Sequence, residues 1–214
     1  MTFIRLFFYK RFALNAFVLQ DYEKALTYFG KIAALCPDTP GAYYNMGLCL
    51  MGLKRFEEAE AAFKEDVNKN GMSHERCRAL GDLGYLWGKK ESATKWYERC
   101  RALSDDHPDA PWLDRRLALL ASVNNMAPLQ ESQRLLEEGI ACMAKKKSAV
   151  AESAFEKAVA KDPTNIQALN NLGVLRMEVN RDPEGAAACF RKITALSGAP
   201  LYAENLKKAL KSES

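Results

Sequence analysis

The chain of 214 residues is long enough to bury a sizeable core, because 48% of its residues are hydrophobic and only 12 are Gly and 8 are Pro. Its 31 basic and 27 acidic residues leave a net charge of only +4, without the concentrated positive surface that nucleic-acid binding requires. The composition therefore excludes a disordered chain and argues against a nucleic-acid partner.

The N-terminus reads MTFIRLFFYKRF, which is apolar enough to suggest a signal peptide or a membrane anchor. Arg5, Lys10 and Arg11 interrupt every window of the roughly 20 largely apolar residues that a spanning helix needs. We therefore expect no direct membrane contact. We expect a helix over residues 4–19 and, after a short turn, a second helix over 22–35.

Two more helix pairs are expected in the first half of the chain. The second pair covers residues 41–51 and 55–68 and ends at Gly71, which can take the left-handed conformation that closes a helix. The third pair begins at Ser73, a suitable N-cap, and its second helix covers residues 91–103.

Three marks recur together along the chain, mostly at steps of 34 residues. A small residue recurs at steps of 34, 34, 58 and 34. An alanine lies 12 positions after each small residue, or 13 positions in the last repeat, and an aromatic residue lies four positions after each alanine. The small residues are Ala13, Gly47, Gly81, Gly139 and Gly173, the alanines are Ala25, Ala59, Ala93, Ala151 and Ala186, and the aromatics are Phe29, Phe63, Tyr97, Phe155 and Phe190. The small residues predict a close crossing of two helices, with the aromatic ring filling the wedge between them.

The clearest copy of the unit has Tyr43, Met46, Gly47, Leu50, Ala59 and Phe63 in the order W-x₂-L-G-x₂-Y…A-x₃-F. This pattern resembles the tetratricopeptide repeat family, and the resemblance extends over five repeats from Leu6 to Gly198. It implies an α-solenoid of helix–turn–helix repeats. No repeat has Trp at the first marked position, and the last repeat carries one extra residue near Asp182 and Pro183.

About two dozen residues are inserted between the third and fourth repeats, because the step from Gly81 to Gly139 is 58 instead of 34. Within the insertion, apolar residues recur at the spacing of a helix, at Trp112, Leu113, Leu117, Leu120 and Val123. These residues predict one unpaired helix over 110–123. It either caps the first three repeats or packs inside a continuous superhelix and changes its pitch. We favour the second, because both faces carry apolar residues and a cap would keep one face polar.

The fourth repeat is expected to pair helices over 129–144 and 149–160, and the fifth to pair 166–179 with 184–196. The lysine triplet 145–147 is interpreted as a solvated turn. A last helix over 201–210, with Lys207, Lys208 and Lys211 outward, would close the array.

The expected fold is thus an all-α solenoid of twelve helices without β-sheet. Its parts are residues 1–107 with repeats one to three, 108–128 with the inserted helix and linker, 129–198 with repeats four and five, and 199–214 with the C-terminal capping helix.

The resemblance also implies a concave binding groove, lined by the first helices of successive repeats. The implied contact residues are, in chain order, Phe7, Lys10, Leu14, Phe17, Tyr44, Asn45, Leu48, Met51, Glu75, Arg78, Asp82, Tyr85, Gln133, Leu136, Glu137, Ile140, Met143, Gln167, Asn170, Asn171, Val174 and Met177. This groove would be apolar at its start, charged in its middle and amide-bearing at its end. Amide side chains can both donate to and accept from a peptide backbone. An alternative is that Phe7, Leu14 and Phe17 pack under the first residues of the chain.

The best-known site of the family grips the carboxylate end of chaperone tails with Lys, Asn, Asn, Lys and Arg. The matching positions here are Lys10, Leu14, Asn45, Glu75 and Ala79. Two of the five match, and Glu75 would repel a carboxylate. This site is therefore not expected.

No catalytic, metal or cofactor site is expected, because the chain has two histidines, no nucleophile–base spacing and no Gly-rich phosphate loop. The six cysteines form no C-x-x-C pair and are interpreted as reduced thiols of a cytoplasmic protein. Cys77 and Cys100 lie in the same repeat as His74 and near His107. A core position is expected for both cysteines in preference to a zinc site.

The leading interpretation is a non-catalytic scaffold that binds a peptide or helix of a partner protein in the groove, with no nucleic acid or small-molecule substrate. The alternative is a structural subunit of a larger assembly, which large apolar patches on the convex side would favour. A third interpretation is a homo-oligomer that associates through the aromatic N-terminal helix.

Overall fold

A computed structural model describes residues 2–37, 39–103 and 106–212, and over these residues all regular elements are helices, joined by short loops, without strands. The helices are α1 (Thr2–Val18), α2 (Tyr22–Leu35), α3 (Ala42–Gly52), α4 (Phe56–Asn70), α5 (His74–Trp87), α6 (Lys90–Ala102), α7 (Ala110–Ser122), α8 (Ala127–Ala144), α9 (Ser148–Lys161), α10 (Ile166–Leu175), α11 (Pro183–Leu196) and α12 (Pro200–Ser212). A π-helical segment, η1 (Arg176–Asn180), follows α10 directly. The expected all-α fold of twelve α-helices is confirmed for the described part of the chain.

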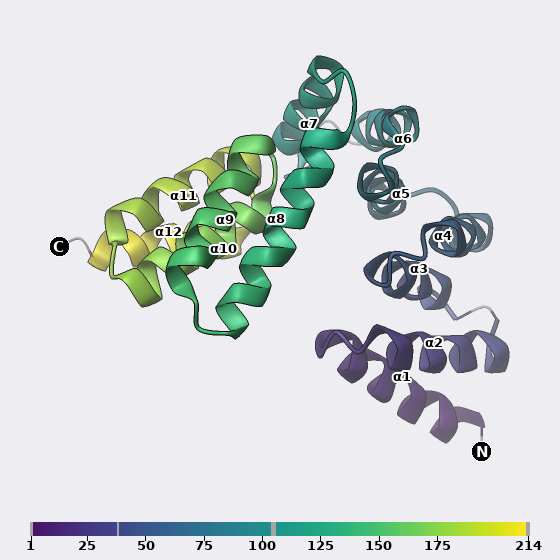
Figure 1. Ribbon diagram of the computed structural model, residues 1–214. Coiled ribbons are helices and arrows are strands. Elements are labelled where there is room, and N and C mark those ends of the chain that lie inside the picture. The colour runs from purple at the N-terminus through teal and green to yellow at the C-terminus, as the bar shows by residue number, and fades with distance from the viewer. Residues whose placement is uncertain (1, 38, 104–105, 213–214) are drawn as a thin grey trace. The chain divides into compact units, whose positions relative to one another are not determined.

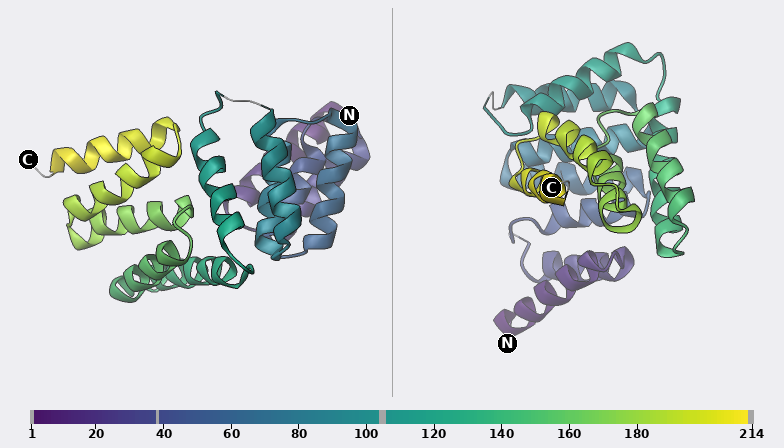
Figure 2. Two further views of the ribbon diagram at one scale, coloured as in Figure 1. Left: turned by 90° about the horizontal axis from the view of Figure 1, so that it is seen from above. Right: turned by 90° about the vertical axis from the view of Figure 1, so that its left-hand side faces the viewer.

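The chain divides into two compact units, Met1–Leu103 with α1 to α6 and Ser104–Ser214 with α7 to α12. In the first unit the helices follow one another as stacked pairs, α1 with α2, α3 with α4 and α5 with α6 (Figures 1 and 2). The division falls four residues before the predicted boundary at residue 107. The continuation of the array as one superhelix across this boundary remains a prediction. None of the described helices has the length and apolar content needed to cross a membrane.

Within a helix pair, the recurring small residue lies directly against the recurring aromatic ring. A Cβ atom on Gly47, Gly81 or Gly173 would stand 2.6, 2.5 or 2.9 Å from the ring of Phe63, Tyr97 or Phe190. The ring itself therefore leaves no room for a Cβ atom at these three positions, whereas the sequence analysis attributed the small residues to the close approach of the two helices. That close approach is found three residues later in the third pair, where a Cβ on Gly84 would lie 2.7 Å from the backbone nitrogen of Ala93.

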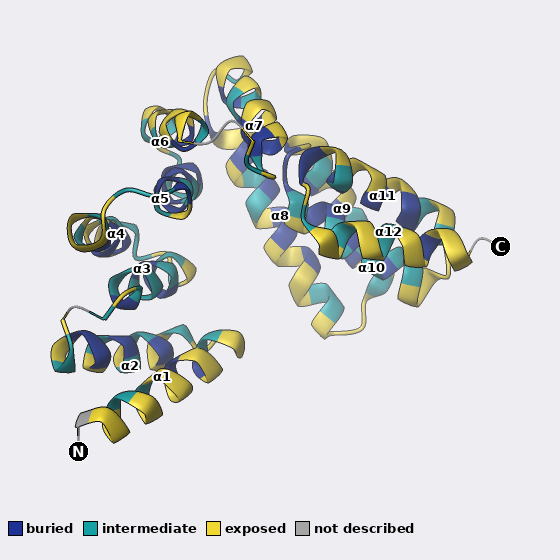
Figure 3. Ribbon diagram, turned by 180° about the vertical axis from the view of Figure 1, so that it is seen from behind, coloured by how far each residue is buried: buried dark blue, intermediate teal, exposed yellow. Residues whose placement is uncertain are grey.

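The core of each unit follows the interfaces between consecutive helices. In the first unit, Phe29 of α2 shares one cluster with Ala42 of α3, and Phe63 of α4 shares the next with Leu80 of α5. In the second unit, Phe155 of α9 lies in a cluster that also contains residues of α8 and α10. Figure 3 shows the buried residues on the inward sides of the helices, with exposed residues on the outer sides. Because each helix pair contributes only one side of such a cluster, it is stable only with neighbours.

The turn inside each pair contains one residue with positive φ, and these residues are Gln20, Lys54, Gly88, Lys146 and Arg181. They lie seven residues after the small residue at Ala13, Gly47, Gly81 and Gly139, but eight residues after the one at Gly173. The extra residue of the last repeat therefore lies inside η1, because a π-helical turn takes more residues than an α-helical turn. The sequence analysis placed it near Asp182 and Pro183, which lie just after this segment.

The inserted helix α7 packs within the second unit, on the turn between α9 and α10. The indole nitrogen of Trp112 donates to the backbone oxygen of Thr164 at 2.8 Å. The guanidinium of Arg116 donates to Asp162 at 2.9 Å and to the same Thr164 oxygen at 3.1 Å. Since both side chains of the ion pair are almost fully buried, α7 is an integral part of this unit.

One face of α7 is buried and the other is exposed. Leu113 and Leu120 are fully buried, whereas Asp114, Arg115 and Ser122 on the opposite side are exposed. Of the apolar residues expected on both faces, only the small side chains of Ala118 and Ala121 lie on the exposed face, with Leu117 and Leu119 half-buried at its edges. The helix covers one edge of the second unit, where α9 ends and α10 begins.

The closing helix α12 packs on α11 through the fully buried Ala209. Lys207, Lys208 and Lys211 are exposed, as predicted for a helix that ends an array. Leu210 is also exposed, so that the outer face is not wholly polar.

Candidate functional site

The predicted contact residues of the second and third repeats come together on one surface. Burial raises the pKa of the Tyr44 hydroxyl on α3, and the carboxylates of Asp82 and Glu75 on α5 raise it further. Leu48 and Met51 pack, half-buried, against the core cluster of α4 and α5. We call this the α3–α5 surface, and it consists of Tyr44, Asn45, Leu48, Met51, Arg78 and Asp82.

The charged groups of the α3–α5 surface are bound to each other and to the chain. Asp82 accepts a hydrogen bond of 2.6 Å from the hydroxyl of Tyr97, and its second oxygen lies 3.8 Å from the guanidinium of Arg78 one helical turn earlier. Arg78 and Asp82 thus form a polar part of this surface, with Asp82 held by two partners. Its charge is partly compensated before any ligand binds.

Asn45 has a structural task in addition to its predicted one. Its side-chain nitrogen donates to the backbone oxygen of Gly41 at 2.8 Å. Gly41 begins α3 with a φ of 80°, a conformation that favours glycine. The amide therefore secures the first turn of α3 and keeps its own oxygen as an acceptor.

The predicted residues of α1 fall into two groups. Phe7, Lys10 and Leu14 are exposed, so the alternative in which Phe7 and Leu14 are covered by the first residues is wrong for the described part of the chain. Phe17 is half-buried instead, with its ring 5.7 Å from that of Tyr22 on α2 in an edge-to-face contact.

Tyr85 also departs from its predicted position on the groove. It is only 7% exposed and belongs to the buried face of α5. Since the side chain is already covered in the free chain, it offers little surface to a partner, and we leave it out of the candidate surface. Its register position is the same as that of the half-buried Met51 in the preceding repeat.

In the second unit the predicted residues lie on α8, α10 and η1. We call the set Ile140, Met143, Asn170, Asn171 and Met177 the α8–α10 surface, of which Ile140 is exposed and the others are half-buried. Leu136, predicted beside them, is a core residue. The side-chain oxygen of Asn170 is buried and has no hydrogen-bond partner within the described residues.

Cys77 and Cys100 occupy the core positions that the repeat pattern predicted for them, and both are fully buried. None of the six cysteines forms a disulfide. Burial raises the pKa of the Cys49 thiol to about 11, so this thiol stays protonated near neutral pH. The sulfur of Cys100 donates to the backbone oxygen of His74 at 3.4 Å, which is a packing role.

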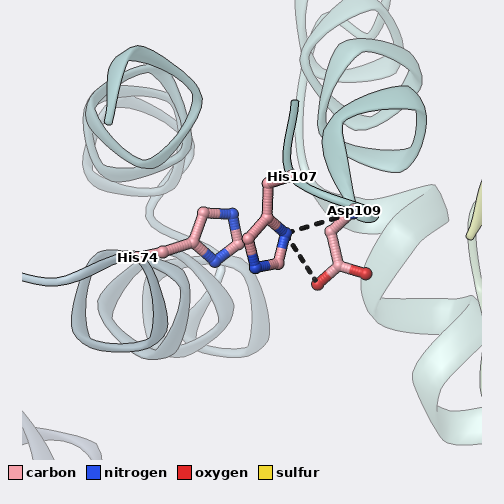
Figure 4. Close-up of side chains that lie close together, drawn as sticks. All are labelled: His74, His107 and Asp109. Atoms are coloured by element: carbon pink, nitrogen blue, oxygen red, sulfur yellow. Dashed lines mark hydrogen bonds and ion pairs between the residues drawn. The ribbon is translucent and has the colours of Figure 1, made fainter. Parts of the chain in front are cut away.

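His107 helps to begin α7. Its Nδ1 atom accepts the backbone N–H of Asp109 at 3.2 Å and lies 4.0 Å from a carboxylate oxygen of the same residue (Figure 4). His74 belongs to the first unit and His107 to the second. Among the described residues, the two histidines therefore form no site within either unit.

Phe8 and Phe12 were missed as functional candidates. Both rings are exposed on α1, although the repeat register places them at positions that are covered in the next two pairs. The available signal was the run LFFYKRF, which contains four aromatic and two basic residues and no carboxylate.

Comparison with known proteins agrees with the repeat pattern. The tetratricopeptide repeat family model matches residues 10–67 and 136–200, which together exceed half of the chain. The structure is similar to a tetratricopeptide repeat protein from Parabacteroides merdae, with 17% identity, a TM-score of 0.51 and coverage of 96% of this chain and 71% of that one. This likeness shows the fold. No curated protein matches the chain.

Two further solved structures cover nearly the whole chain. The MamA protein is 18% identical, with a TM-score of 0.47 and coverage of 98% of this chain and 96% of that one. YrrB, described as a TPR protein with an unusual peptide-binding site, is 20% identical, with a TM-score of 0.45 and coverage of 94% and 90%.

Proposed function

Because the chain belongs to the tetratricopeptide repeat family, we propose that it is a non-catalytic protein-binding module that holds an extended or helical segment of a partner protein on the α3–α5 surface. The observation that supports this proposal is the half-buried apolar strip of Tyr44, Leu48 and Met51 with polar groups beside it. A partner side chain that completes this burial would contribute about 25 cal/mol per Å² of apolar area.

The polar groups of the surface would orient the bound segment. The nitrogen of the Asn45 amide already donates to Gly41, and the orientation of the amide is thereby fixed. Its oxygen can accept a backbone N–H of the bound segment. The Arg78–Asp82 pair is partly exposed and would contribute little to affinity. Leu14 occupies the position of Leu48 one repeat earlier, so a longer segment would extend toward α1.

The α8–α10 surface is proposed as a second, separate contact. A buried oxygen without a hydrogen bond, as on Asn170, costs free energy in the free chain. A rotation of this amide toward solvent would allow it to accept a backbone N–H of a bound segment. Asn171, the next residue, lies half-buried on the same helix and could bind the neighbouring peptide group.

The exposed side chains argue against the alternative of a permanently covered assembly subunit. Of the large hydrophobic side chains exposed in the described residues, the second helices α2, α4, α6, α9 and α11 carry one, Val150. An assembly subunit would need broad apolar patches on these outer helices. The first helices, by contrast, expose apolar side chains on α1 and α8.

Site-specific photo-crosslinking in intact cells would test the proposal. A photoreactive phenylalanine analogue at Leu48 should capture a partner protein, whereas the same residue at Ala61, on the exposed outer side of α4, should not. Leu48→Glu should then weaken binding of the captured protein by about tenfold or more, because it places a charge in the apolar strip.

The control is Ala61→Glu, which adds the same charge on the outer side and should leave binding unchanged. Crosslinks from Ala61 but not from Leu48 would contradict the proposal. They would place the contact on the outer helices instead.

A further inference from the structure

The N-terminal helix α1 exposes an unusual amount of apolar surface. Eight of the fourteen large hydrophobic side chains that are exposed in the described residues lie between Phe3 and Leu19. Among them, Phe8 and Phe12 are each 46% exposed and lie one helical turn apart. Contiguous exposed apolar surface of this kind marks an interaction site.

The repeat register shows what kind of element is missing from this face. The positions of Phe8 and Phe12 are taken in the second pair by Ala42 and Met46, one repeat later, and both belong to the cluster in which α2 packs on α3. The position of Phe12 is taken in the third pair by Leu80, which α4 covers. On α3 and α5 the preceding helix thus buries this face, and on α1 it is open.

The face is preformed by aromatic contacts. The rings of Phe8 and Phe12 stack at 6.1 Å, and the ring of Phe12 lies 5.4 Å from that of Tyr28 on α2. Tyr28 in turn lies 6.1 Å from Tyr9. Since each ring is held by the next, little side-chain entropy remains to be lost on binding. We call Phe8, Phe12 and Tyr28 the aromatic end face.

Positive charge surrounds the aromatic end face. Arg5 and Arg11 each lie three residues from Phe8, on the same side of α1, and neither has an ion-pair partner among the described residues. The ammonium of Lys31 lies 5.1 Å from the centre of the Tyr28 ring. The described part of α1 contains no carboxylate. A ligand of this face should therefore carry negative charge.

The charge also argues against a second copy of this chain as the ligand. Two α1 helices placed face to face would bring their arginines together. The other exposed apolar helix end, α12 with Leu210, carries Lys207, Lys208 and Lys211. Either pairing would join two basic surfaces.

We propose that the aromatic end face is a docking site for an amphipathic helix of another protein, with carboxylates beside its apolar stripe. Such a helix would extend the array by taking the place that α2 has on α3 and α4 has on α5. The site is separate from the α3–α5 surface, so that it does not depend on the function proposed above.

A peptide of residues 56–70 is a suitable probe, because it has the sequence of α4, which covers the equivalent face of α5. It contains five acidic and two basic residues, a net charge of −3. Labelled, N-acetylated and C-amidated, it should bind the full chain saturably in fluorescence anisotropy. A control peptide with Gln or Asn in place of the five acidic residues should bind several-fold more weakly than the acidic peptide. This difference in affinity should become smaller at high salt.

Two pairs of substitutions assign the binding to the aromatic end face. Phe8→Ser with Phe12→Ser should weaken binding of the acidic peptide by about tenfold or more. Arg5→Glu with Arg11→Glu, which removes no packing, should weaken binding of the acidic peptide and leave binding of the neutral peptide unchanged. Val150→Ser, at an exposed hydrophobic side chain of similar exposure on α9 of the second unit, is the matched control and should leave binding within about twofold.

Several results would overturn the proposal. They are the absence of saturable binding, equal binding of the acidic and neutral peptides, and retention of binding in both double variants. Sedimentation of the chain as a dimer that Phe8→Ser with Phe12→Ser dissociates would make a second copy the ligand. Binding to phosphatidylserine vesicles that depends on the same two rings, without binding of the peptide, would make it a membrane surface.

Discussion

The first unit repeats its helix pair at a constant step from Ala13 through Gly47 to Gly81, whereas the second unit adds α7 before its first pair and one residue within its last. The regular unit leaves one end open, at the aromatic end face. The irregular unit covers one of its edges with α7 and closes its end with α12. Regular repeats therefore determine how neighbouring pairs pack, and additional elements determine which surfaces stay accessible.

A buried carboxylate occurs in each unit, and the two have different partners. Asp66 in the first unit and Asp162 in the second are both fully buried. Asp66 is paired with Arg76 of the next helix, whose side chain is 20% exposed, whereas Asp162 is paired with Arg116 of α7, whose side chain is 6% exposed. The pair that holds α7 is thus the more completely removed from water.

The largest expected effect follows from this difference. Arg116→Ala leaves the charge of Asp162 buried without its cation, and should lower the free energy of unfolding of the second unit by about 3–5 kcal/mol. Urea unfolding followed by tryptophan fluorescence would measure it, in a chain in which Trp87 and Trp96 of the first unit are replaced by Phe. Arg115→Ala, at the exposed neighbour, should change stability by less than about 0.5 kcal/mol.

The corresponding change in the first unit should have a smaller effect. Arg76→Ala leaves Asp66 with the hydrogen bond from Asn70, of 2.8 Å, and with water near the vacated side chain. If Arg76→Ala lowered the free energy of unfolding as much as Arg116→Ala, the two buried ion pairs would contribute equally to the stability of their units.

The next effect concerns the contact that both units share. Gly81→Ala places a Cβ atom 2.5 Å from the Tyr97 ring and should cost about 1–3 kcal/mol by overpacking. Gly30→Ala, inside α2, is the control, because no atom lies within 4 Å of its Cβ position. It should instead stabilise the chain by about 0.5–1 kcal/mol. Thermal unfolding would show opposite shifts, and a neutral Gly81→Ala would disprove the requirement for glycine.

A smaller effect is expected when the irregularity of the second unit is removed. Deletion of the exposed Glu178 restores the seven-residue spacing from Gly173 to Arg181, so that η1 should become α-helical with a stability change within about 1 kcal/mol. Deletion of the exposed Gly52 shortens the regular spacing after Gly47 and should cost far more. Circular dichroism and urea unfolding of both deletions would decide. Similar losses would mean that the π-helical segment is not where the extra residue is absorbed.

The smallest effect concerns the turns. Lys54 has a φ of 59°, a conformation that glycine adopts more readily, and the equivalent position of the third pair is Gly88. Lys54→Gly should stabilise the first unit by about 0.5 kcal/mol, and Gly88→Lys should destabilise it by about 1 kcal/mol. Thermal unfolding of both variants would check the pair. A loss of stability in Lys54→Gly would show that its side chain is needed for another reason.

The helix pairs could be predicted from the sequence because their determinants are close together in it. Each recurring glycine meets an aromatic ring of the next helix in the chain, across a single turn, so that spacing alone identifies both. The candidate surface was predicted less well. Leu48 and Asn45 lie where the register placed them, but Tyr85 is buried, because a register position specifies a direction and not how much the neighbours cover.

By itself, the sequence determined the family, the twelve helices and the existence of an inserted helix, since spacing and apolar periodicity are local properties. Only the tertiary structure decided that α7 lies on the second unit, through an ion pair between Arg116 and Asp162, 46 positions apart in the chain. It alone also showed that Phe8 and Phe12 are uncovered. Both facts depend on which helix occupies a neighbouring position in space, and no spacing within a repeat contains that information.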